Sequence, residues 1–214
     1  MLIGSGEFSF GQTEEFDRFL LERMPPSRRR MRFLPTASGS MEYARHFGEY
    51  IRGLDADVEF MSIPVYRARD ARREKNLALI RGSGVVYLGG GLSTTAAEVL
   101  GQPPLIEALR EVIADGGVVA AIGGAASALG SVCGDRNAVS AGMDFIAGCA
   151  IVAPFDPSDD QDLRALASQP TVTLGVGVPA LTAVAIGPGG NASIMGDGSI
   201  AVVRKPADAT REQS

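Results

Sequence analysis

The fold is decided by the stretch VVAAIGGAASA, which runs from Val118 to Ala128. Its first five residues, Val118–Ile122, are all apolar, as expected of a strand that is buried on both faces of a parallel sheet. Two glycines follow, and small residues then lead into a predicted helix over 123–129. The stretch therefore predicts a buried strand that turns directly into a helix, through residues small enough for a tight bend.

Strands and helices alternate on the N-terminal side of this stretch. Apolar runs predict strands at 2–4, 31–34, 58–63 and 84–88, and helical spacing predicts helices at 13–24, 40–54, 71–80, from 94, and at 104–115. Alternation of helices with strands that are apolar throughout is typical of a parallel sheet with helices on both faces. We therefore expect a three-layer αβα sandwich of the flavodoxin or amidotransferase type.

The C-terminal third has a different pattern. A strand-like segment at 144–153 and an acidic helix at 157–168 are followed by four short β segments separated by glycine turns. This pattern predicts a mixed or antiparallel β extension at the edge of the same sheet. We expect one α/β domain over 1–204 and a polar tail over 205–214.

Composition restricts the class of protein. Of the 214 residues, 45% are hydrophobic and 21% are charged, which is typical of a globular domain. A net charge of −5 argues against general binding to nucleic acid. We find no apolar run long enough to cross a bilayer and no signal-peptide pattern. Cys133 and Cys149 lack the spacing of a metal or redox site, so we expect reduced thiols, a cytoplasmic location, and no metal or cofactor.

The turn after Val118–Ile122 has the pattern of a nucleophile elbow. In such an elbow the reactive side chain lies on a strained turn at the carboxyl edge of the sheet. The following backbone N–H groups stabilise the negative charge that develops during acyl transfer. The residues two positions before and after the reactive one must be small.

On these residues the chain resembles the dipeptidase E and cyanophycinase serine peptidases, within the class I glutamine amidotransferase-like superfamily. Gly123–Ala128 resembles the family's G-T-S-A-G-A elbow. Four other stretches resemble family segments in the same order: LIGSGE at 2–7, PTAS at 35–38, YLGGGLS at 87–93 and GVPALTA at 177–183. The resemblance implies the α/β fold above, a small peptide or amino-acid-like ligand, and a homodimer.

The departures from the family pattern concern its catalytic groups. The resemblance places Ala125 where the family has its serine, and a methyl group cannot attack a carbonyl. The family's histidine segment corresponds to APFD at 153–156, and its Asp-Glu pair corresponds to Pro179 and Ala180. We therefore expect no intact catalytic residue and interpret the chain as a non-catalytic homologue.

An active hydrolase with a relocated nucleophile is the main alternative. It would use Ser127, with His46 as the base and Glu42 or Asp156 as the acid. A nucleophile at Ser127 would place Leu129 where an elbow requires a small residue. We therefore expect Ser127 to fill a small position and help to cap the helix, and His46 to lie on a helix surface.

Three other features have simpler interpretations than a reactive site. Cys133 is expected to be a buried structural thiol. The acidic residues Asp156, Asp159, Asp160 and Asp162 follow no metal-loop spacing and suit the start of a helix. The triple glycine lacks the motifs of nucleotide-binding loops, although a Rossmann-like nucleotide module is a third alternative.

A binding crevice is expected at the carboxyl ends of the strands, where open α/β sheets bind their ligands. Its predicted lining consists of Gly89, Gly90, Gly91, Leu92, Ala125 and Ala126.

Overall fold

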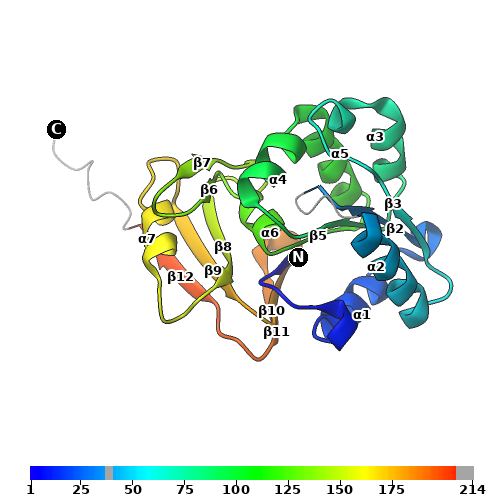
Figure 1. The fold of residues 1–214 in the computed structure, drawn as a ribbon, viewed down its shortest axis with the longest axis horizontal. Coiled ribbons are helices and arrows are strands. Elements are labelled where there is room, and N and C mark those ends of the chain that lie inside the picture. Colours follow the sequence, from blue (N-terminus) through cyan, green and yellow to red (C-terminus); the bar gives the residue numbers. More distant parts are fainter. Residues whose placement is uncertain (37–40, 206–214) are drawn as a thin grey trace.

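The computed structural model describes residues 1–36 and 41–205. Its larger sheet has seven strands in the order β11-β10-β1-β5-β4-β2-β3 (Figure 1). The neighbours β1–β5, β5–β4, β4–β2 and β2–β3 are parallel, whereas β10 and β11 extend the sheet in antiparallel fashion. The strands are β1 (Leu2–Ile3), β2 (Arg30–Leu34), β3 (Glu59–Ser62), β4 (Val85–Leu88), β5 (Val118–Ile122), β10 (Thr182–Ile186) and β11 (Ala192–Gly196).

Helices cover both faces of this sheet. Alternate strand residues point to opposite faces, so Val85 and Tyr87 pack on one side while Val86 and Leu88 pack on the other. Figure 1 shows α1 (Glu14–Glu22) and α2 (Met41–Leu54) on one side. The opposite side carries α3 (Glu74–Arg81), α4 (Ser93–Leu100) and α5 (Pro103–Ala114). The expected αβα sandwich is confirmed.

A second sheet is the main difference from the sequence prediction. It has five strands in the order β12-β9-β8-β6-β7 and lies beside the first in Figure 1. Only β10 and β11 form the predicted edge extension, because the chain leaves the first sheet after β5 and rejoins it at β10. The elements are β6 (Val132–Gly134), β7 (Val139–Ala141), β8 (Cys149–Phe155), α7 (Gln161–Ala167), β9 (Leu174–Pro179) and β12 (Ala201–Arg204).

Two predicted segments fall partly outside the described residues. They are the loop and helix start at 37–40 and the tail from 206 onward. Within the described ranges, no helix has the length and apolar character needed to cross a bilayer.

A buried carboxylate lies among aromatic rings beneath α2. Asp17 of α1 is fully buried, and its Oδ2 accepts hydrogen bonds from the Thr13 hydroxyl at 2.7 Å and the Tyr50 hydroxyl at 3.0 Å. Its Oδ1 has no hydrogen-bond partner among the described residues. Burial raises the pKa of Asp17 to about 6, because the charged form loses its hydration.

Candidate functional site

The sharp turn after β5 is formed by Gly123. Strand β5 ends at Ile122, whose register partner is Ile3 of β1, and the Gly123 N–H donates to the Ile3 carbonyl at 2.9 Å. Gly123 has φ 59° and ψ −131°, and α6 (Gly124–Ala128) begins at the next residue. A side chain is strained in this region of backbone conformation, so glycine is the natural residue for the apex.

The prediction that Ala125 occupies the apex is wrong. Ala125 lies inside α6 with no exposed surface, and so does Ala126. The alignment on the family's elbow placed Gly123 and Gly124 before the apex. The register of β5 on β1 instead places Gly123 at the apex itself. The apolar run Val118–Ile122 ends directly before Gly123, and this end of the run was the signal in the sequence that could have located the turn. The apex still carries no hydroxyl or thiol, since glycine has no side chain.

The predicted glycine loop lies against this turn. A Cβ added to Gly124 would lie 2.0 Å from the Gly91 carbonyl oxygen, and one added to Gly90 would lie 3.4 Å from that of Ile122. The loop and the elbow therefore pack backbone to backbone, which only glycines permit. Of the six predicted lining residues, Gly91 and Leu92 are exposed, Gly90 is half-buried, and the others are buried: Gly89, Ala125 and Ala126.

Two further segments with family resemblance flank the other side of the turn. The Gly4 N–H donates to the Thr182 carbonyl at 2.9 Å, and the Leu181 N–H donates to the Ser5 carbonyl at 3.0 Å. Leu181 has a positive φ of 54° and is 41% exposed. The structure therefore brings the start of the chain, the elbow and the turn between β9 and β10 to one edge of the sheet.

Ser127 performs a structural task. Its hydroxyl is buried in α6, accepts a hydrogen bond from the Ala153 N–H at 3.0 Å and donates to the Ala153 carbonyl at 3.3 Å. These bonds connect α6 to β8 of the second sheet. The expected packing role agrees with this placement, whereas the expected helix cap does not, because the hydroxyl bonds to β8 instead.

The structure does not assemble the alternative catalytic set. His46 is exposed on α2 and contacts the guanidinium of Arg45, on the face opposite to α6. Glu42 is also exposed on α2, and Asp156 is exposed after β8, where it accepts hydrogen bonds from Ser158. Ser127 therefore has neither a base nor an acid from this set within reach.

The thiols are buried. Cys133 and Cys149 are both free, and burial raises the pKa of each, to about 11 for Cys149. A thiol with a raised pKa has little thiolate at neutral pH, so it is a poor nucleophile.

The acidic residues near α7 form ion pairs. Asp159 and Asp162 pair with Arg136, and Asp160 pairs with Arg164. In the part of the chain that the structure describes, no group of three histidine, cysteine, aspartate or glutamate residues is arranged to hold a metal ion.

The αβα sandwich and its strand–turn–helix elbow define the class of the protein as an α/β sandwich. The model of peptidase family S51 matches residues 1–146, a range that includes the elbow and most of the larger sheet. The chain belongs to peptidase family S51. No curated protein matches its sequence.

Solved structures show the same fold. A peptidase from an acI-B1 Actinobacterium is 22% identical, with a TM-score of 0.79 over 95% of this chain and 89% of that chain. A putative peptidase E protein from Listeria monocytogenes EGD-e is 10% identical, with a TM-score of 0.57 over 96% of this chain and 97% of that chain. At these identities the likeness concerns the fold alone.

Proposed function

We propose that this chain is a non-catalytic homologue of the serine peptidases in its family, and that it acts by binding instead of covalent hydrolysis. The observation that carries the proposal is Gly123 at the apex of the elbow. Covalent acyl transfer needs a nucleophilic side chain at this turn and a base beside it. Glycine supplies neither an oxygen nor a sulfur atom there.

The ligand in this proposal is a small peptide or an amino-acid-like molecule at the carboxyl edge of the larger sheet. Exposed apolar side chains, Leu92 and Leu181, lie on loops that contact opposite flanks of the turn. At the start of α6 only Gly124 is partly exposed, because Ala125 and Ala126 have no exposed surface. The proposal includes a homodimer, which rests on the family resemblance. It also includes a cytoplasmic location, which rests on the free thiols.

The test combines a fluorophosphonate probe with a peptidase assay on aspartyl dipeptides and cyanophycin-like peptides. We expect no labelling and no hydrolysis by the natural chain. Ser127→Ala is the control for a relocated nucleophile. Labelling of the natural chain that disappears in Ser127→Ala would overturn the proposal.

Gly123→Ser restores a hydroxyl at the apex. A Cβ at Gly123 would have no neighbour nearer than the Gly4 carbonyl oxygen at 3.8 Å, so a serine side chain has space there, but the φ of 59° strains its backbone. We expect this variant to remain inactive on the peptides, because the chain's single histidine, His46, lies on α2. If Gly123→Ser hydrolyses the peptides faster than the natural chain does, a base must be present near the turn. The missing hydroxyl at the apex would then be the one reason that the natural chain is inactive.

A further inference from the structure

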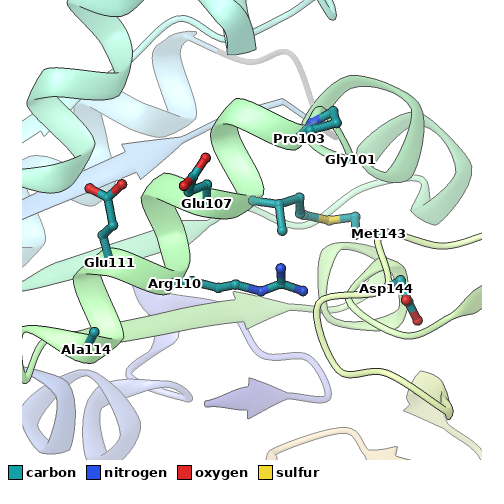
Figure 2. A pocket seen from close by; sticks show the side chains of 9 residues that line it. Gly101, Pro103, Glu107, Arg110, Glu111, Ala114, Met143 and Asp144 are labelled. Atoms are coloured by element: carbon teal, nitrogen blue, oxygen red, sulfur yellow. The ribbon is translucent and has the colours of Figure 1, made fainter.

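Two neighbouring pockets lie along α5, away from the elbow, and both are lined by Arg110. The wider one has a volume of about 700 Å³ and is shown in Figure 2. The narrower one has a volume of about 300 Å³, which is at the lower end of the range for small-molecule sites.

The narrower pocket is mostly apolar, and besides Arg110 its lining includes Met1, whose amino group donates to the Val119 carbonyl at 2.7 Å. Its lining includes Leu2, Val119 and Leu129, which are all buried in the core. Ile113 and Ile186 line its exposed side and are 48% and 49% exposed. Apolar surface that lines an open pocket can bury the hydrocarbon part of a ligand.

Arg110 supplies a positive charge next to this apolar surface. The side chain is exposed, and within residues 1–36 and 41–205 it has no hydrogen-bond or ion-pair partner. Figure 2 shows it extending from α5 towards Met143 and Asp144, while the carboxylates of Glu107 and Glu111 project from another side of the helix.

The carboxylates near Arg110 do not pair with its guanidinium. Glu111 pairs with Arg81 at 2.9 Å, and Asp144 accepts a hydrogen bond from the Ser131 hydroxyl. Glu107 lies three residues before Arg110 but makes no ion pair with it. The guanidinium is therefore free to bind an added anion, although the surrounding carboxylates disfavour a ligand with two negative charges.

We propose that this groove binds a small monocarboxylate with a hydrocarbon tail. The tail occupies the apolar pocket, and the carboxylate pairs with Arg110. An arginine fork matches a carboxylate with two parallel hydrogen bonds. The acidic wall of the wider pocket selects a singly charged carboxylate over a phosphate ester.

Calorimetric titration with octanoate tests the proposal on the whole chain. Octanol carries the tail without the charge, propionate carries the charge with a short tail, and octyl phosphate carries a head group with a higher negative charge. We expect octanoate to bind at least about tenfold more tightly than each of the other three, because only octanoate satisfies both parts of the site.

Two variants separate the contributions of head group and tail. Arg110→Gln should weaken octanoate binding about tenfold or more and leave octanol binding unchanged within about twofold. Ile113→Glu should weaken both ligands, since it places a carboxylate beside the apolar pocket. Val202→Glu is the matched control, because Val202 is 56% exposed on β12 of the other sheet, and it should bind like the natural chain.

Octanoate binding that is unchanged in Arg110→Gln would overturn the proposal. A failure of octanoate to bind would also overturn it. Light scattering on the same samples then tests whether a second copy of the chain covers this surface and so prevents octanoate from binding. That would be the case if Ile113→Glu converts a dimer to a monomer and Val202→Glu does not.

Discussion

At the scale of single residues, Asp17 is the side chain with the clearest consequence for stability. Its pKa is raised from 3.8 to about 6 by burial, and one of its oxygens lacks a partner among the described residues. The folded protein therefore holds this proton more tightly than the unfolded chain does. The stabilisation that results is complete below pH 4 and is lost as the pH rises through about 6.

We expect Asp17→Asn to remove this pH dependence. The shift corresponds to about 3 kcal/mol, so the free energy of unfolding of Asp17→Asn relative to the natural chain should rise by about that amount between pH 3 and pH 8. Urea denaturation across this pH range provides the measurement. Glu15→Gln, an exposed change on the same helix, is the control and should give a flat difference. A difference for Asp17→Asn that does not vary with pH would contradict the assignment.

At the scale of elements, the pairing of β2 with β3 contains a buried cation. The Arg32 side chain is 3% exposed, and its Nη2 donates to Glu59 Oε1 at 2.6 Å, across the pair. The hydrogen bond and the charge of Arg32 lower the pKa of Glu59. The Arg32 Nε has no hydrogen-bond partner in the described chain, and Nη1 donates to the Glu59 backbone carbonyl at 3.0 Å, so the Glu59 carboxylate is the charged partner of the guanidinium.

Glu59→Ala should lower the free energy of unfolding by about 1 kcal/mol, because it leaves the buried Arg32 without its carboxylate, and the 55% exposure of Glu59 weakens the pair through solvent screening. Glu49→Ala is the control, since Glu49 forms an exposed pair with Arg45 on α2 that should contribute at most about 0.5 kcal/mol. Arg32→Met should be close to neutral, because it removes the buried charge together with its need for a partner. Equal effects of Glu59→Ala and Glu49→Ala in chemical denaturation would contradict this account.

At the scale of the whole molecule, the two sheets meet at α6, which lies between them in Figure 1. The Ser127 hydroxyl satisfies both the N–H and the carbonyl of Ala153 on β8. A short helix of small residues thereby joins the elbow of the first sheet to the second sheet. The residue that the sequence offers as an alternative nucleophile is already engaged in this connection.

Ser127→Ala should lower the free energy of unfolding by about 1–3 kcal/mol, because it leaves two buried backbone groups of Ala153 unpaired. Hydrogen exchange at the Ala153 amide should become faster than in the natural chain. Ser140→Ala, at an exposed position on β7, is the control and should change neither quantity. Unchanged exchange at Ala153 in Ser127→Ala would show that the hydroxyl does not connect the sheets.

The larger sheet was predictable because its central strands, β4 and β5, are apolar on both faces and because its strands alternate with amphipathic helices. Strand β4 and the helix α5 illustrate this, since each is recognisable from about ten residues of local pattern. The second sheet was not predictable, because the pattern of β8 and β9 indicates strands but does not identify their neighbours. Strand pairing is set by hydrogen bonds between distant segments, such as Ile151 with Val176.

The sequence by itself determined that the chain has the order of motifs of its family and that residues 121–126 contain no hydroxyl or thiol. Only the tertiary structure decided that Gly123 forms the apex, that Ser127 binds β8, and that His46 lies on the opposite face. The physical reason is that the end of β5 is fixed by its hydrogen bonds to β1, more than a hundred residues away in the chain. No local window of sequence contains that register.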